Sequence, residues 1–201
     1  MDIICECAEN YNKLKKNIYR FVVSKNRKTW EIKLNFEDKD FYHLAGFHYL
    51  TDISIPKSRK NTLKEIINKR RITDELLYKS KLFESPESNK NIRTRIEELR
   101  FLEEYLDVEN YIRIYNTRND KYLHSSIDSD YIIESRLKDK NYSVYIFLKK
   151  SRESPEYLCV NSFFKKENIT YGGDNLYWML KEKITDTECQ IIYKHPDYTD
   201  K

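Results

Sequence analysis

The second half of the chain is dominated by short strand-like segments, and this run constrains the fold more than any other feature. Apolar, β-branched and aromatic residues fill each segment, and polar residues, Gly and Pro separate them. We predict six strands, at 111–116, 131–137, 142–149, 157–165, 176–184 and 189–193. Turn signals lie between them at Asn119-Asp120, 138–141, Ser154-Pro155 and Gly172-Gly173. The 17 Tyr and 9 Phe residues can give such a sheet a large buried core.

The first half is predicted to be helical apart from one hairpin. Residues 3–16 have the spacing of a short amphipathic helix, and 17–25 and 28–36 alternate with period two around a short polar link. Further helices are predicted at 38–53, 58–71, 73–82 and 87–107, with Asp38 or Asp40 as a cap of the first. We therefore expect a single α+β domain over 1–201. It would have an N-terminal helix and β-hairpin, a central helical block (about 38–107) and a mainly antiparallel sheet (about 111–193).

Charge and cysteine usage narrow the class of protein. The net charge of +4 is too small to indicate nucleic-acid binding by itself, but 57–71 is strongly basic and 97–109 strongly acidic. The four cysteines form no C-x-x-C pair and no regular framework, and the histidines lack ligand spacing, so neither zinc nor another cofactor is expected. No apolar run is long enough for a membrane helix, so we expect a cytoplasmic protein with reduced thiols.

Residues 41–53 (FYHLAGFHYLTDI) place two histidines on either side of one glycine. On a helix, His48 and Asp52 share a face, so the carboxylate is predicted to orient the imidazole and raise its basicity. His43 and His48 do not share a face unless the helix bends at Gly46, where glycine permits a bend. Two imidazoles near a phosphate suit RNA cleavage without a metal, because one can take the 2′-OH proton while the other protonates the leaving 5′ oxygen.

A purely structural interpretation of the same segment stays open. Leu44, Phe47 and Leu50 are predicted core residues, so the two histidines can simply flank a buried helix.

The segment also resembles the signature of a known group of proteins. The matching residues follow a hairpin and precede a basic helix: His43, Leu44, Gly46, His48, Leu50 and Asp52, with the later stretches 145–149 (YIFLK) and 159–164 (CVNSFF). This pattern resembles phage and mobile-element domains assigned to the nuclease superfamily of barnase, EndoU, the tRNase colicins and RelE. The resemblance runs roughly from the first hairpin to Lys183. It implies a metal-independent RNase in which a helical part packs on an antiparallel sheet, although no arginine is clearly placed on a central strand.

Two further sets of residues are candidates for contacts with RNA. Lys149 ends the predicted central strand, where it can stabilise the charge of a pentavalent phosphorane, or can simply be a solubilising lysine at a strand edge. The basic segment 58–71 would attract a phosphate backbone, and the alternative is a solvated helix face. Its cations predicted to bind RNA are Arg59, Lys60, Lys64, Arg70 and Arg71.

Two functions remain in competition at this level. The favoured hypothesis is an RNase-like domain that cleaves tRNA or another structured RNA to a 2′,3′-cyclic phosphate. His48 would be general base or acid, Asp52 would orient it, His43 would be its counterpart and Lys149 an electrostatic stabiliser. The alternative is a non-catalytic phage or mobile-element protein that binds and inhibits a host defence protein or nucleoprotein complex, because a Tyr-rich, electrically polarised surface suits such binding. RNA is the expected partner in the first case, and a host defence or antitoxin protein in the second.

Overall fold

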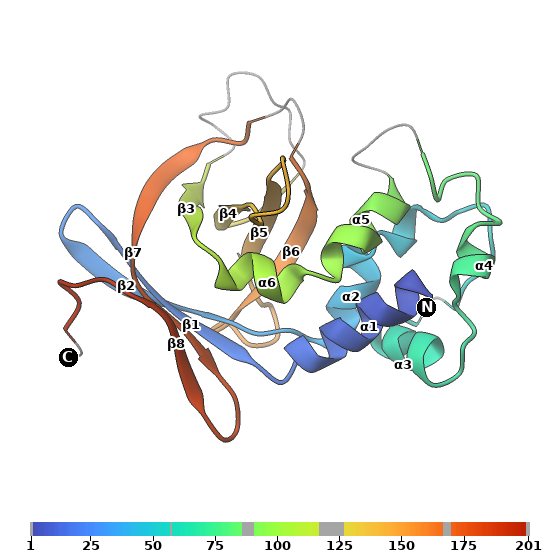
Figure 1. Cartoon of the computed structure of the whole chain (residues 1–201), viewed down its shortest axis with the longest axis horizontal. Coiled ribbons are helices and arrows are strands. Elements are labelled where there is room, and N and C mark those ends of the chain that lie inside the picture. Colours follow the sequence, from blue (N-terminus) through green and yellow to red (C-terminus); the bar gives the residue numbers. More distant parts are fainter. Residues whose placement is uncertain (1, 57, 86–90, 117–126, 167–169, 200–201) are drawn as a thin grey trace.

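Helices and strands occupy opposite sides of the computed structural model, which describes residues 2–56, 58–85, 91–116, 127–166 and 170–199 (Figure 1). The helices are α1 (Ile3–Leu14), α2 (Asp38–Leu44), α3 (Thr62–Ile67), α4 (Asp74–Leu77), α5 (Ile92–Leu99) and α6 (Leu102–Asp107), with 3-10 turns η1 (Phe47–Tyr49) and η2 (Arg59–Asn61). The strands are β1 (Ile18–Lys25), β2 (Lys28–Leu34), β3 (Asn110–Tyr115), β4 (Tyr131–Ser135), β5 (Val144–Lys150), β6 (Leu158–Lys165), β7 (Gly173–Ile184) and β8 (Cys189–Lys194). No helix of the described ranges is both long and apolar enough to span a membrane.

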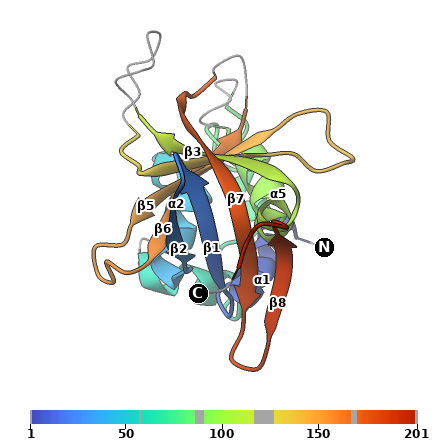
Figure 2. The same cartoon turned by 90° about the vertical axis from the view of Figure 1, so that its left-hand side faces the viewer.

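The strands close into a seven-membered barrel. Their order is β1-β2-β6-β5-β4-β3-β7-β8, and β1 also pairs with β7, so that β1 to β7 form a ring and β8 lies outside it as an extra strand. The β1–β7 ladder runs from the pair Ile18 and Ile184 to the pair Ser24 and Tyr177. Figure 2 shows β1, β7 and β8 side by side at the front of the molecule. The N-terminal hairpin is therefore part of the same sheet as the late strands.

One seam of the ring is much shorter than the others. β2 meets β6 in parallel at the single pair Leu34 and Leu158, and the amide N–H of Asn35 donates to the carbonyl oxygen of Leu158 at 3.1 Å. All the other strand pairs of the ring are antiparallel. The barrel is thus a mixed but mostly antiparallel sheet.

The central strand β5 is buried on both faces, as expected for its continuous apolar sequence. Val144, Ile146 and Leu148 belong to the main core, which also contains the buried faces of the helices. Tyr145 and Phe147 point the other way, into a second cluster with Tyr115 and Ile132. A strand held between two clusters gives the residues at its end a rigid support.

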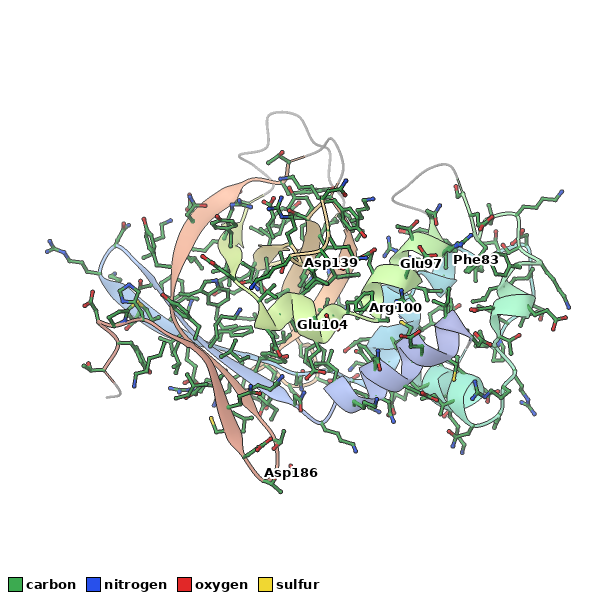
Figure 3. All side chains as sticks on the ribbon, in the orientation of Figure 1. Phe83, Glu97, Arg100, Glu104, Asp139 and Asp186 are labelled. Atoms are coloured by element: carbon green, nitrogen blue, oxygen red, sulfur yellow. The ribbon has the colours of Figure 1, made fainter. Side chains whose placement is uncertain are left out.

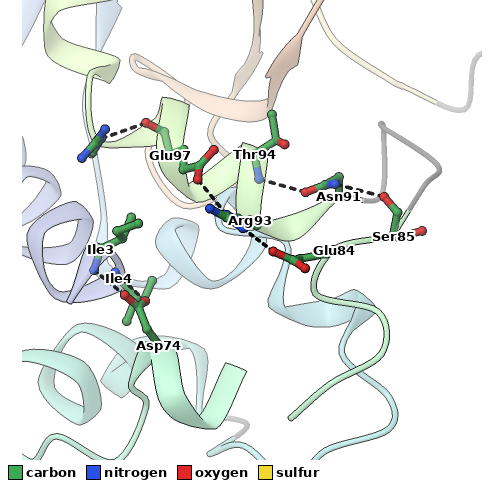
Figure 4. Close-up of polar contacts among 10 residues, drawn as sticks. Ile3, Ile4, Asp74, Glu84, Ser85, Asn91, Arg93, Thr94 and Glu97 are labelled. Carbon is green, nitrogen blue, oxygen red and sulfur yellow. Dashed lines mark hydrogen bonds and ion pairs between the residues drawn. The ribbon is translucent and has the colours of Figure 1, made fainter. Parts of the chain in front are cut away.

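The helical block is fastened by side chains that cap its helix ends. The carboxylate of Asp74 in α4 accepts hydrogen bonds from the amides of Ile3 and Ile4 at 2.6 and 3.1 Å, which caps the start of α1 (Figure 4). Asn91 caps α5 by accepting from the amide of Thr94 at 2.9 Å. Glu97 at the end of α5 and Arg100 just after it are labelled in Figure 3, and the guanidinium of Arg100 bonds Glu6 of α1 at 3.1 Å. These contacts hold α5 in a fixed position.

The α+β fold class and the order of its parts are confirmed, but several predicted helices are too long. The helix predicted at 38–53 ends at Leu44, that at 58–71 is reduced to η2 and α3, and that at 73–82 is reduced to α4. The helix predicted at 87–107 is two helices, broken at Arg100 and Phe101. Positive φ at Gly46 and Arg70 accounts for two of these early ends, because helical backbone requires negative φ. Lys57, residues 87–90 and the turn at Asn119-Asp120 lie outside the described residues.

Candidate active site

The two histidines of segment 41–53 are brought together by a bend at Gly46. Helix α2 ends at Leu44, and Gly46 adopts a left-handed conformation with φ of 79° before the 3-10 turn Phe47–Tyr49 begins. Glycine suits this position because it has no Cβ to clash in that conformation. As a result the rings of His43 and His48 stack, with centroids 4.3 Å apart and planes at 18°.

A buried arginine from another part of the chain lies against this bend. Arg95 of α5 is 6% exposed, and its guanidinium carbon lies 5.6 Å from the centre of the Tyr49 ring. A Cβ placed on Gly46 would lie 3.2 Å from Cδ of Arg95, so the glycine also makes room for the arginine. Nothing in the sequence pairs residue 95 with segment 41–53, and so sequence analysis missed it.

Burial and nearby cations keep both imidazoles neutral. Burial lowers the pKa of His43 below its usual range, and the charges of Arg95 and Arg59 lower it further. The same causes, with His43 as an additional one, lower the pKa of His48 to about 4. Nδ1 of His48 is buried, and among the described residues it has no hydrogen-bond partner. Neutral imidazoles accept protons, so the pair has the protonation state that a general base needs.

His43 opens into a cavity of about 360 Å³ between α2 and the β5–β6 hairpin. Arg59 and Lys149, both predicted as site residues, line the same cavity. Lys149 faces Cys159 across the β5–β6 ladder, which fixes its place at the cavity wall. The cavity therefore joins His43, Arg59 and Lys149, and His48 lies directly behind His43.

Asp40 is a further titratable group in this cavity, and the sequence analysis considered it only as a helix cap. It lies one helical turn before His43, so the two side chains share a face of α2. Its Oδ2 accepts a hydrogen bond from the amide of Glu37 at 3.2 Å. Burial, with the charge of Glu37 as a smaller contribution, raises the pKa of Asp40 to about 6. The spacing of Asp40 and His43 is a signal that the sequence already contained.

The cavity lining is predominantly cationic. Its acidic members are Asp40 and Glu153, and its cations are Lys39, Arg59, Lys149, Lys150 and Arg152. Lys39 is held by Glu37 and Glu153 at 2.8 and 2.7 Å, and Lys149 pairs with the exposed Asp128. The Arg59 side chain is exposed and makes no ion pair or hydrogen bond with the described residues. A phosphate group would find an available guanidinium there.

Asp52 does not contact His48, and the prediction that it orients this imidazole is wrong. The Asp52 carboxylate accepts hydrogen bonds from the hydroxyl of Ser80 at 2.5 Å and the amide of Lys81 at 2.8 Å. These hydrogen bonds lower the pKa of Asp52. His48 does not contribute to that lowering. The expected contact required one helix through both residues, whereas the 3-10 turn ends at Tyr49 and the chain leaves it in an irregular path.

The basic segment 58–71 does not form one cationic face. Arg59 lies at the cavity, and Lys60 lies close enough to Glu153 of the cavity to lower the pKa of that carboxylate. Lys69 and Arg71 instead pair with the buried Glu65 at 2.7 and 3.4 Å. The remaining two cations predicted to bind RNA are both exposed: Lys64 on α3, and Arg70 in the loop after it. Only Arg59 and Lys60 are therefore placed near the two histidines.

The thiol of Cys159 is poorly suited to act as a nucleophile in this cavity. Cys159 lines the cavity, but burial, with Asp40 as a smaller cause, raises the pKa of its thiol to about 11. A thiol of that pKa carries little of the nucleophilic thiolate. Within the described parts of the chain, no group of three or more His, Cys, Asp or Glu side chains has the arrangement of a metal site.

Comparison with known proteins supports the resemblance seen in segment 41–53. One family model, described as phage-Barnase-EndoU-ColicinE5/D-RelE like nuclease4, matches residues 3–197. No curated protein and no solved structure matches the chain. Since the matched range covers nearly the whole sequence, the chain belongs to the phage-Barnase-EndoU-ColicinE5/D-RelE like nuclease4 family.

Proposed function

We propose that the protein is an RNase that cleaves RNA by proton transfer in the cavity of His43, and that the product is a 2′,3′-cyclic phosphate. The single observation that carries the proposal is the shared cavity: His43 and Asp40, two groups that can exchange protons near neutral pH, lie in it with the available cation Arg59. Membership of a nuclease-like family is consistent with this chemistry.

In the proposed reaction His43 is the general base and Asp40 the general acid. Neutral His43 takes the proton of the 2′-OH, whose oxygen attacks phosphorus and forms the new P–O2′ bond. Protonated Asp40 gives its proton to the 5′ oxygen as the P–O5′ bond breaks, which releases a 5′-OH end. Histidine is left protonated and aspartate ionised, and exchange with water restores both groups.

The cations of the cavity stabilise the charge that develops on the phosphate oxygens. Arg59 binds the phosphate. Lys149 adds its charge once its ion pair with the exposed Asp128 breaks. His48 and Arg95 do not line the cavity. His48 holds His43 in place by stacking, and the charge of Arg95 helps to keep His43 neutral. His48 is therefore a positioning residue in this proposal, not the proton carrier expected from the sequence.

The proposed substrate is tRNA or another folded RNA. The chain has a modest net charge of +4, whereas cations outnumber acids in the lining of the cavity. A folded RNA presents phosphates at separated points and can meet such localised charges. All four cysteines are free thiols, which suits the reducing cytoplasm as the proposed compartment.

The test is a cleavage assay with a folded RNA in EDTA, comparing wild type with His43→Ala and Asp40→Asn. The proposal expects wild type to produce 2′,3′-cyclic phosphate ends and each variant to be at least about a hundredfold slower, as is typical for loss of a general acid or base. Arg27→Gln, in the β1–β2 turn away from the cavity, is the matched control and should cleave normally.

Two results would overturn the proposal. One is a folded wild-type protein that cleaves no RNA. The other is cleavage that survives unchanged in His43→Ala, because the activity would then belong to a contaminant or to another site. Circular dichroism of each variant ensures that a loss of activity is not a loss of fold.

A further inference from the structure

A second concave surface lies on the other side of the barrel wall, where β3, β7 and β8 meet. It is an open groove of about 980 Å³, and it shares no lining residue with the cavity of His43. Nothing in the proposed cleavage mechanism uses it. Its walls and floor are nevertheless rich in groups that bind ligands.

The groove arises from the way two strands share one edge of β7. β3 pairs with the first part of β7, Gly173–Leu176, and β8 pairs with its last part, from Leu180 to Ile184. Between them the edge of β7 is bonded by the amide of His195, which donates to the carbonyl oxygen of Met179 at 2.9 Å. The interruption in the sheet leaves a notch that side chains from all three strands surround.

Exposed tyrosines form the walls of the notch. Tyr111 of β3 is 71% exposed and Tyr177 of β7 is 68% exposed. They lie one position beyond the cross-strand pair Ile112 and Leu176, which places both side chains on the same face of the sheet, at the groove. Tyr193 of β8, 40% exposed, closes the third side. Neighbouring aromatic rings on a sheet surface are the arrangement on which unpaired bases stack.

Buried polar groups form the floor. Lys181 is 3% exposed, its ammonium donates to the carbonyl oxygen of Val108 at 2.9 Å, and it lies 5.2 Å from the centre of the Trp178 ring. Burial lowers the pKa of Lys181 to about 8. Asn110 is 5% exposed, and its side-chain amide nitrogen donates to the carbonyl of Tyr105 at 3.0 Å. The side-chain oxygen of Asn110 is buried and has no hydrogen-bond partner among the described residues.

We propose that this groove binds an unpaired base of the RNA, with the base stacked on Tyr111 and Tyr177 and its polar edge turned to Lys181 and Asn110. This inference rests on the proposed RNase function for the identity of the ligand. The rim supports it, because Arg113 and Lys166 both pair with the single carboxylate of Glu134, at 3.1 and 2.5 Å. The groove is also lined by Asp107, which pairs with Lys183 at 2.6 Å, and by Glu109. Apart from that pair, the cations Arg113, Lys166 and Lys181 exceed the carboxylates Glu109 and Glu134 by one charge, which favours the phosphate attached to the base.

The floor also predicts which bases fit. An ammonium offers three N–H groups, and one of those of Lys181 is used by Val108, so the others can donate to a base carbonyl. The oxygen of Asn110 has no hydrogen-bond partner among the described residues and is buried, so it accepts a hydrogen bond from a ring N–H once the side chain turns towards the groove. Uracil and guanine carry a carbonyl beside a ring N–H, whereas adenine has no carbonyl. The groove is therefore expected to prefer uracil or guanine to adenine.

An apolar side chain of a protein partner fits this floor less well. It would cover the ammonium of Lys181 without giving its remaining N–H groups a hydrogen bond, and buried polar groups without partners are costly. The polar floor thus favours a base over the side chains that usually anchor a protein–protein interface.

The chain contains two tryptophans, and this makes the groove directly observable. Trp30 lies on β2, where its indole N–H donates to the hydroxyl of Tyr131, so Trp30→Phe leaves Trp178 of the groove as the only indole fluorophore. The probe is a short 2′-O-methyl oligouridylate, which has no free 2′-OH and cannot be cleaved. We expect saturable quenching of Trp178 and weaker binding of the matched oligoadenylate.

Two variants test the assignment in this background. Tyr177→Ala removes an exposed ring and is expected to weaken binding by about tenfold or more, as loss of one stacked base does. Lys181→Met is expected to reduce the preference for uridylate over adenylate while stacking persists. Tyr78 is another exposed tyrosine, 50% accessible and outside the groove, so Tyr78→Ala should bind like the parent.

The results separate this inference from the proposed function. If no oligonucleotide quenches Trp178, or if Tyr177→Ala binds as tightly as the parent, the base-binding site is refuted even when the protein cleaves RNA. Quenching by an aromatic peptide but not by oligonucleotides would make the groove a protein-docking surface and would equally refute it. Quenching with the expected preference, in a protein that cleaves nothing, would support the groove and refute the RNase.

Discussion

The imidazole of His43 lies face to face with that of His48, with ring centroids 4.3 Å apart, although a glycine bend separates the two residues in sequence. The stack allows only one of the two rings to face the cavity, and that ring is His43. Two histidines that looked equivalent in the sequence therefore differ in position: one lines the cavity and the other stacks on it from behind.

Gly46→Ala should destabilise the protein and impair the site. Its φ of 79° is unfavourable for alanine by about 1–2 kcal/mol, and the added Cβ would press on Arg95 Cδ at 3.2 Å. We expect a loss of free energy of unfolding of at least that size, measured by urea denaturation, with a lower rate of RNA cleavage. A variant as stable as wild type would show that residue 46 is not left-handed.

Cleavage should depend on pH with a maximum on the acid side of neutrality. The proposed general base, His43, must be neutral, and its pKa is lowered; the proposed general acid, Asp40, must be protonated, and its pKa is about 6. Above pH 6 the rate should therefore fall as Asp40 ionises, towards tenfold per pH unit. In Asp40→Asn the residual rate should lose this alkaline limb. A wild-type rate that rises steadily to pH 8 would contradict the assignment.

His48 should make the fold less stable in acid. Its folded pKa of about 4 is below the ordinary histidine value of 6.5, so the folded state binds fewer protons than the unfolded chain. This contribution is fully present above pH 6.5 and is lost as pH falls towards 4, by up to about 3 kcal/mol. In His48→Phe, which keeps a stacking ring, the free energy of unfolding should vary less with pH over this interval. Equal pH dependence in the two proteins would argue against a neutral His48.

Arg59 should contribute to RNA binding more than other exposed arginines do. Because its guanidinium is unpaired among the described residues and lines the cavity, Arg59→Gln is expected to raise KM for RNA about tenfold and to reduce the salt dependence of binding. Arg27→Gln, with the same change of charge in the β1–β2 turn, should have little effect. Identical behaviour of the two variants would mean that Arg59 acts only through the overall charge.

Asp52→Asn separates the sequence-based assignment from the structural one. The carboxylate holds Ser80 and Lys81 and does not contact His48, so the substitution should lower the thermal midpoint and leave the pH profile of cleavage unchanged. If Asp52 oriented the catalytic histidine, the profile itself would change. Measuring both quantities on one preparation decides between the two roles.

The strands and the α+β class were predictable because each depends on local alternation of apolar and polar residues. β1, β2 and β8 begin or end within a residue or two of their predicted bounds. The barrel was not predictable, since it depends on the pairing of β1 with β7 across most of the chain. Local pattern says that a segment is a strand, but it does not say which strand will lie beside it.

The site was only partly predictable for a similar reason. Segment 41–53 drew attention to His43, and its glycine indicated a bend. The direction of that bend depends on Arg95 and Ile92 of α5, which occupy the space beside Gly46. Asp52 was misassigned because helical spacing was extended past the point where the helix ends. The same spacing argument could have identified Asp40, which lies three residues before His43 on α2.

The short seam between β2 and β6 lies next to the cavity, because Cys159, Val160 and Asn161 follow directly after its single pair at Leu158. A closed ring of β-strands opens first between the two strands that are joined by the fewest hydrogen bonds. The cavity of His43 thus borders the part of the barrel that opens at the lowest cost, and amide hydrogens there should exchange with solvent well before those of the long β1–β7 ladder. The wall that shapes this cavity is also the easiest wall to loosen, so the proposed site could widen without unfolding of the barrel.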